Sequence, residues 1–119
     1  MGDDGEEYVS MASHYQVEDL ARFGDMGKVD PKNFENFMKW YGGAMEAGAI
    51  DANTKKLIAL AVSFAVQCPY CIDAYSKGCA EAGFTPEQMA EAVGIAASIK
   101  GGAVIAHFVQ ATNTLEREG

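Results

Sequence analysis

The chain has 119 residues, of which 49% are hydrophobic and 22% are charged, and its formal net charge at pH 7 is −8. This length and hydrophobic content fit one small folded domain and argue against a disordered protein. The excess of acids argues against nucleic acid and anionic membrane surfaces as partners, because binding to both draws on clustered Lys and Arg.

The N-terminus is acidic and rich in Gly, so we predict a disordered tail over residues 1–13, followed by a single domain over residues 14–119. A secretory signal would instead be basic and lead into an apolar segment. The longest apolar run, from Leu57 to Val66, has about half the length of a membrane span. We therefore expect a cytoplasmic protein with no membrane partner.

The first predicted element is a short amphipathic segment from Tyr15 to Phe23, which Gly24 stops. Asp30 and Pro31 have the residue types of an N-cap and a first helical position, and apolar residues follow at helical spacing. The pattern predicts a helix that begins there and ends by Gly48.

The middle of the chain predicts two more helices. Asp51 is the next N-cap candidate, and the helix that it opens runs to about Gln67, where Pro69 forces a break or a new start. A further helix is predicted from Tyr70 to Ala82, with Gly83 ending it in a left-handed conformation.

The last third begins with Thr85-Pro86-Glu87-Gln88, which has the form of a capping box with Pro at the first helical position. It predicts a helix from Pro86 to about Ile99. We expect Gly101-Gly102 to turn the chain into a last helix over residues 103–115. No segment alternates with a period of two, so the predicted fold class is all-α, a bundle of about six helices.

The helix predicted from Asn53 to Gln67 is apolar nearly all round, and a chain of this length has little else to cover it. We therefore expect a homo-oligomer. Lys56, Ser63 and Gln67 form one polar lane on this helix, which leads toward Cys68; the plainer interpretation is a solvent-facing edge.

Cys68-Pro69-Tyr70-Cys71 stands at a predicted helix start. A helix N-terminus lowers the pKa of a cysteine because its free amides and dipole stabilise the thiolate. The two-residue spacer lets the sulfurs close a small ring, so a reversible dithiol–disulfide couple is the chemistry that this motif predicts.

Two other interpretations of the pair remain open. The cysteines could be an inert buried pair. They could also bind zinc, which would need two further ligands from Cys79, His14, His107 and the carboxylates, although no second pair at metal-ligand spacing occurs. We predict neither a metal nor a cofactor.

Three more residues are candidates for the site. Tyr75 lies one helical turn after Cys71, where its hydroxyl could bond to a thiolate or relay a proton. His107 lies at the edge of an apolar stripe, where a histidine can be structural or catalytic. Cys79 more plausibly packs in the core.

The segment from Lys56 to His107, with CPYCIDAY and GGAVIAH inside it, resembles the carboxymuconolactone decarboxylase and alkylhydroperoxidase D superfamily, and the similarity extends over about residues 30–115. These two motifs also look like the narrower group of arsenosugar biosynthesis-associated peroxidase-like proteins. The resemblance implies an all-helical subunit that forms trimers or hexamers, with the CxxC at a helix start near a subunit interface.

The resemblance also implies roles. Cys71 would attack a peroxide, Cys68 would resolve the resulting sulfenic acid, and an external dithiol would reduce the disulfide. The family's Glu twelve residues before the first cysteine is Lys56 here, and its His four residues after the second is Tyr75. We expect the charge of Lys56 to stabilise a thiolate and His107 to supply the missing imidazole.

The function predicted from the sequence is therefore a thiol-dependent oxidoreductase, an alkylhydroperoxidase-like antioxidant or disulfide reductase. Members with true lactone decarboxylase activity lack the CxxC, which argues against that activity. Two alternatives are an accessory protein that binds a soft species such as arsenite through the two thiolates, and a structural family member without turnover.

Overall fold

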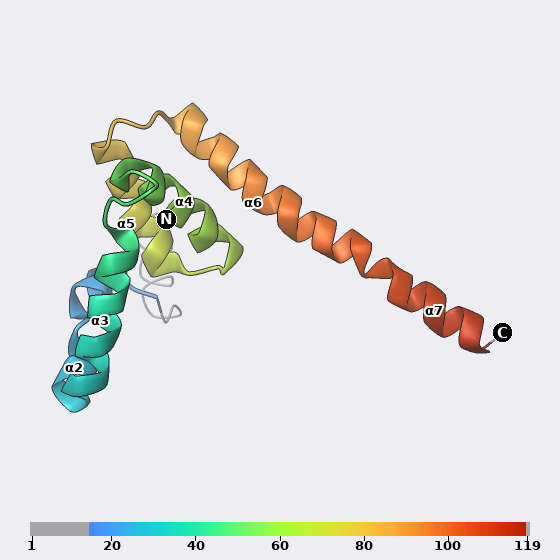
Figure 1. Ribbon diagram of the computed structural model, residues 1–119, viewed down its shortest axis with the longest axis horizontal. Helices are drawn as coiled ribbons and strands as arrows, with labels where there is room; N and C mark the ends of the chain where they lie inside the picture. Colours follow the sequence, from blue (N-terminus) through green and yellow to red (C-terminus); the bar gives the residue numbers. More distant parts are fainter. Residues whose placement is uncertain (1–14, 119) are drawn as a thin grey trace, which may run out of the picture. The chain divides into compact units, whose positions relative to one another are not determined.

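The computed structural model describes residues 15–118, so the predicted tail over residues 1–13 and His14 lie outside the described residues. Within this part of the chain every regular element is a helix, which confirms the all-α fold class (Figure 1). The chain divides into two compact units, residues 1–52 and 53–119.

The first unit contains the 3-10 helix η1 (Val17–Arg22) and the α-helices α2 (Asp25–Val29) and α3 (Pro31–Met45). The predicted start of α3 is confirmed, because the Asp30 carboxylate accepts a hydrogen bond from the Asn33 backbone at 3.4 Å. The Asn33 side-chain amide donates to the same carboxylate at 2.9 Å. The short helix α2 was not predicted.

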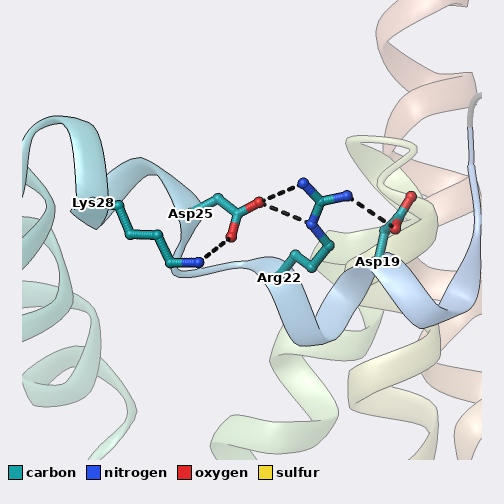
Figure 2. Close-up of polar contacts among 4 residues, drawn as sticks. All are labelled: Asp19, Arg22, Asp25 and Lys28. Carbon is teal, nitrogen blue, oxygen red and sulfur yellow. Dashed lines mark hydrogen bonds and ion pairs between the residues drawn. The ribbon is translucent and has the colours of Figure 1, made fainter.

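Alternating charges connect η1 to α2, as Figure 2 shows. The Arg22 guanidinium lies 2.9 Å from Asp25 and 3.9 Å from Asp19, and Lys28 lies 3.5 Å from Asp25. Desolvation raises the pKa of Asp25, but Arg22 and Lys28 outweigh it and hold this pKa below its ordinary value. The aromatic rings of Phe23 and Phe34 pack with their centroids 5.8 Å apart.

The second unit contains α4 (Ala52–Ala65), α5 (Pro69–Glu81), α6 (Pro86–Ala106) and α7 (Phe108–Glu118). The capping box predicted at the start of α6 is confirmed. Gln88 donates its backbone N–H to the Thr85 hydroxyl at 3.1 Å, and its side chain accepts from the Thr85 backbone at 2.9 Å.

The predicted turn at Gly101-Gly102 is wrong, because α6 continues through both glycines to Ala106. A glycine inside a helix costs only about 1 kcal/mol relative to alanine, and neither a proline nor a capping residue follows the pair. The break falls instead at His107, whose backbone angles stay right-handed. Helix α7 therefore continues the course of α6, and we call Pro86–Glu118 the rod (Figure 1).

Few apolar side chains are buried in the described part of the chain: Leu60 and Cys79 almost completely, and Ala92 to a lesser degree. An open apolar groove of about 540 Å³ lies beside Leu60, where α4, α5 and the start of α6 meet. The rod is long and apolar enough to cross a membrane by length and composition alone, and none of its most apolar part is buried within the chain.

Candidate functional site

The turn from α4 into α5 brings the chain to the cysteine pair. Cys68 donates its backbone N–H to the Ser63 carbonyl at 3.1 Å, and Gln67 donates its own to the Phe64 carbonyl at 3.2 Å. This is a Schellman ending, in which the residue after the helix adopts a left-handed conformation. Here that residue is Gln67, with a φ of 57°. The paired helix ending fixes the backbone of Cys68 at the start of α5.

Cys68 is the N-cap of α5, and Pro69 takes the first helical position. The Cys68 sulfur accepts a hydrogen bond from the Cys71 backbone N–H at 3.3 Å. Sulfur thus fills the place that a Ser or Asp oxygen normally takes at a helix start. The amides and dipole of the helix end favour negative charge on this sulfur.

Cys68 and Cys71 are joined as a disulfide, with their Cα atoms 5.3 Å apart. This Cα separation lies in the normal range for disulfides, so the first turn of α5 accommodates the bridge. Cys79 is the free cysteine of the described chain and is fully buried, as its helical spacing predicted. Between residues 15 and 118, no three His, Cys, Asp or Glu side chains come together as a metal site.

Lys100 is a neighbour of the pair that the sequence did not reveal. Its ammonium donates a hydrogen bond to the Ala65 carbonyl at 2.8 Å and so helps to close the C-terminal end of α4. The bond fixes the middle of α6 to the segment that leads into Cys68, and it adds a cation three residues before it. Thirty-five residues separate the partners, and no local pattern signals such a contact.

Lys56 lies against the second half of α5. Its Cδ comes within 3.9 Å of where a Cβ on Gly78 would stand. Burial raises the pKa of the Cys79 thiol, and the nearby charge of Lys56 opposes this rise. Gly78 follows Cys71 by seven residues, which is about 10 Å along a helix. The Lys56 side chain therefore lies about two helical turns from the cysteine pair.

Tyr75 is half-buried on α5, one turn after Cys71. His107 is exposed at the junction of α6 and α7, and its Nδ1 lies 2.6 Å from the Ala103 carbonyl of its own helix. It follows Lys100 by seven residues, again about 10 Å along the rod. The pair, Tyr75 and Lys100 are therefore grouped around the α4–α5 turn, whereas the His107 ring bonds to the rod.

Residues 31–114 match the carboxymuconolactone decarboxylase family, and this segment is most of the chain. The chain belongs to the carboxymuconolactone decarboxylase family. Solved structures agree with this placement. A family member from Legionella pneumophila aligns over 85% of this chain and 91% of its own, with a TM-score of 0.64 and 29% identity.

A second family member, from Thermotoga maritima, aligns over 71% of this chain and 88% of its own, with a TM-score of 0.55 and 30% identity. It is described with a suggested part in an antioxidative response. Among curated proteins, an uncharacterized protein of the cox locus of Paracoccus denitrificans is 45% identical over 69 residues, which are 58% of this chain. An uncharacterized protein of Haemophilus influenzae is 38% identical over 55 residues, 46% of this chain. The matched segments span 62% and 49% of these two relatives.

Proposed function

We propose that the chain is a thiol-dependent oxidoreductase of the alkylhydroperoxidase type, in which Cys68 and Cys71 alternate between dithiol and disulfide. The observation that carries the proposal is the placement of Cys68 at the N-cap of α5 and of Cys71 in its first turn, with their Cα atoms 5.3 Å apart at the positive end of the helix dipole. The family includes peroxidases of this type, and the Thermotoga relative is linked to an antioxidative response.

The reaction has three steps. The Cys71 thiolate attacks the outer oxygen of a hydroperoxide, the O–O bond breaks, and the products are a Cys71 sulfenic acid and an alkoxide that takes up a proton. The Cys68 thiol then attacks the sulfenic sulfur, so that a disulfide forms and water leaves. An external dithiol donates two electrons and two protons to restore the pair.

Three side chains are proposed to assist. Tyr75 lies on the same side of α5 as Cys71, one turn away, so its hydroxyl is a candidate donor of the proton that the alkoxide needs. Lys100 adds positive charge at the Ala65 carbonyl, three residues before Cys68, and Lys56 adds it near Cys79, about two helical turns after Cys71. His107 could act only through a rearrangement or a second copy, because its ring is held by the rod.

The partners of this function are a small peroxide or disulfide substrate, a dithiol reductant and further copies of the chain, as a trimer or hexamer in the cytoplasm. Neither a metal nor a cofactor is needed, because the two sulfurs carry both electrons. We also propose that the chain is a member of the arsenosugar-associated group, because its CPYCIDAY and GGAVIAH motifs resemble that group.

Thiol counting on the wild type, Cys68→Ser and Cys71→Ser tests the mechanism. Each protein is reduced, freed of reductant and mixed with one equivalent of an alkyl hydroperoxide. We expect the wild type to lose two thiols and Cys68→Ser to accumulate a sulfenic acid on Cys71 that dimedone traps. Cys71→Ser should react at least 100-fold more slowly, because its remaining thiol is the resolving one. Equal reactivity of the two variants would reverse or abolish the assigned roles.

The alternative function is binding of arsenite by two close thiolates. The Cys68–Cys71 spacing serves this chemistry as well, so the same three proteins separate the functions. Stoichiometric arsenite binding that needs both cysteines, together with no loss of thiols to peroxide, would favour the accessory role.

A further inference from the structure

The last turn of α4 ends in carbonyl groups that need donors from outside the helix. Three of them accept backbone N–H groups of the α4–α5 turn, at 2.9–3.2 Å. The next carbonyl, that of Ala65, accepts a hydrogen bond from the Lys100 ammonium at 2.8 Å. Lys100 belongs to α6 and completes, from a distant part of the chain, the helix ending that leads into Cys68.

Two helix ends of opposite polarity meet at Cys68. The end of α4, three residues earlier, carries the negative end of a helix dipole, and the start of α5 carries a positive end. The Cys68 sulfur accepts the Cys71 backbone N–H at 3.3 Å, so the positive end acts on it directly. The negative end of α4 would oppose a thiolate at this place. The Lys100 ammonium, bound to the Ala65 carbonyl, offsets it.

The charged groups that α4 and α5 place near the pair add less. Asp73 lies in the second turn of α5, and its carboxylate pairs with the Lys77 ammonium at 3.2 Å, so the two charges largely cancel. Lys56 lies against the second half of α5, about two turns from the pair. The stability of a thiolate on Cys68 therefore depends mainly on the start of α5 and on Lys100.

The sulfur that is stabilised as a thiolate is also the better leaving group. In thiol–disulfide exchange, a thiolate attacks one sulfur and expels the other, and the sulfur of lower pKa leaves faster. The donor to the Cys68 sulfur is a backbone N–H, so no rearrangement is needed to supply it when the S–S bond breaks. The same stabilisation makes Cys68 the weaker nucleophile, which agrees with attack on a peroxide by Cys71.

We propose that Lys100 is a positioning residue of the couple, which makes Cys68 the leaving thiolate and directs an external dithiol to the Cys71 sulfur. One thiolate of the reductant bonds to the Cys71 sulfur, the Cys68–Cys71 bond breaks, and its electron pair stays on Cys68. The second thiolate of the reductant then closes the reductant's own disulfide and expels Cys71, which takes up a proton. This role rests on the Cys68–Cys71 couple of the proposed function and concerns its reductive half.

Trapping of the mixed disulfide shows which sulfur leaves. The oxidised wild type is mixed briefly with β-mercaptoethanol, quenched with acid and blocked with N-ethylmaleimide, and fragment-ion mass spectrometry locates both groups. We expect mercaptoethanol on Cys71 and maleimide on Cys68, in severalfold excess over the reverse arrangement. In Lys100→Gln this excess should shrink. Equal amounts of the two products in the wild type, or an excess of the reverse one, would overturn the proposal.

The pKa of Cys68 measures the part that Lys100 plays. A Cys71→Ser background keeps the backbone N–H that the Cys68 sulfur accepts, and the pH dependence of alkylation by iodoacetamide then gives the pKa of Cys68, since Cys79 is buried. Lys100→Gln in this background should raise this pKa by about 0.5 unit or more, because a nearby cation is lost. Lys100→Arg should leave it nearly unchanged, because a guanidinium keeps the charge and also donates to a carbonyl.

Arg117→Gln is the matched control, because it removes the same charge from the rod. Its place is about 25 Å further along the rod than that of Lys100, beyond the roughly 10 Å over which exposed charges interact at about 0.1 M ionic strength. It should leave the pKa of Cys68 unchanged. Circular dichroism and urea denaturation report the folding of each variant. A Lys100→Gln variant that is less stable, but has the parent's pKa and trapping products, would show a merely structural role and overturn the proposal.

Peroxide is absent from all of these measurements, so failure of the proposed function and failure of this role are separate results. If the chain reduces no peroxide but the trapping and pKa results are as expected, the role of Lys100 stands for any dithiol that opens the pair. If the chain reduces peroxide but mercaptoethanol attaches to Cys68, the peroxidase function stands and this role is wrong.

Discussion

Gln67 and Gly83 occupy the same position in two equivalent helix endings. Each follows its helix with a positive φ, 57° for Gln67 and 92° for Gly83, and each is bracketed by the same pair of backbone hydrogen bonds. Glycine adopts this conformation without strain, whereas a residue with a Cβ pays about 1 kcal/mol for it. The strained residue is the one that directly precedes the cysteine pair, and backbone strain of this kind often accompanies a functional position.

Gln67→Gly should therefore stabilise the folded chain by about 0.5–1 kcal/mol, because the relief of strain exceeds the extra entropy of glycine in the unfolded state. Chemical denaturation at a fixed protein concentration measures it. Gln67→Ala is the control, since it keeps the strained Cβ and removes the rest of the side chain, and it should bring no gain in stability. A destabilised Gln67→Gly would mean that the Gln side chain itself holds the turn.

Lys100 shows what a single residue does over a long sequence separation. Its bond to the Ala65 carbonyl supplies a donor to a helix end that Gln67 and Cys68 only partly satisfy. The positive charge is also favourable at the negative end of the α4 dipole. One exposed side chain thus couples the middle of α6 to the backbone that positions Cys68.

At the scale of elements, residue types that act locally were predicted well. Asp30 with Pro31 and Thr85 with Pro86 begin helices because a short side chain bonds to amides within the next turn. The start of α5 was predicted near Tyr70 from the break that Pro69 forces, and the structure adds that the Cys68 sulfur caps this helix. The two cysteines of the candidate site, Cys68 and Cys71, follow from this local chemistry.

Features that depend on the energy of a whole helix or on packing were not predicted. Gly101-Gly102 has the residue types of a turn, but the apolar residues on both sides continue the helical pattern, and the hydrogen bonds of α6 outweigh two unfavourable propensities. The contact of Lys100 with α4 and the place of Lys56 beside Gly78 arise from tertiary structure alone.

The two glycines of α6 should respond differently to substitution. Both have open space around the Cβ position, so Gly101→Ala should stabilise the chain by about 0.5–1 kcal/mol through helix propensity. Gly102 shares one side of α6 with the exposed side chains of Ile95, Ile99 and Ile105, and we expect Gly102→Leu to weaken self-association of the chain while Gly101→Leu does not. Thermal unfolding and light scattering of the three variants measure both effects. Equal self-association of the two Leu variants would mean that Gly102 takes no part in it.

At the scale of the whole molecule, few apolar residues are buried in the described part of the chain. In the described part of the chain, Leu60 and Cys79 are the large side chains that are fully buried. Most large apolar side chains of the rod are exposed. We propose that contacts between copies supply part of the folding free energy, and the stability of the chain should then rise with its concentration.

The buried thiol of Cys79 gives the stability of the molecule an alkaline limit. Burial raises its pKa above the ordinary value of 9.0, so above this pH the unfolded chain releases the proton while the folded chain keeps it. The unfolded state then binds fewer protons, and the free energy of unfolding falls as pH rises from 9.0 toward the folded pKa; below 9.0 the thiol contributes no slope. In the disulfide form, where Cys68 and Cys71 do not titrate, the wild type should lose up to about 1.4 kcal/mol per pH unit more than Cys79→Ala. Denaturation between pH 8 and pH 10.5 (roughly the range over which a thiol ionises), at constant protein concentration, compares the two slopes, and parallel slopes would show that Cys79 ionises as readily in the folded chain as in the unfolded one.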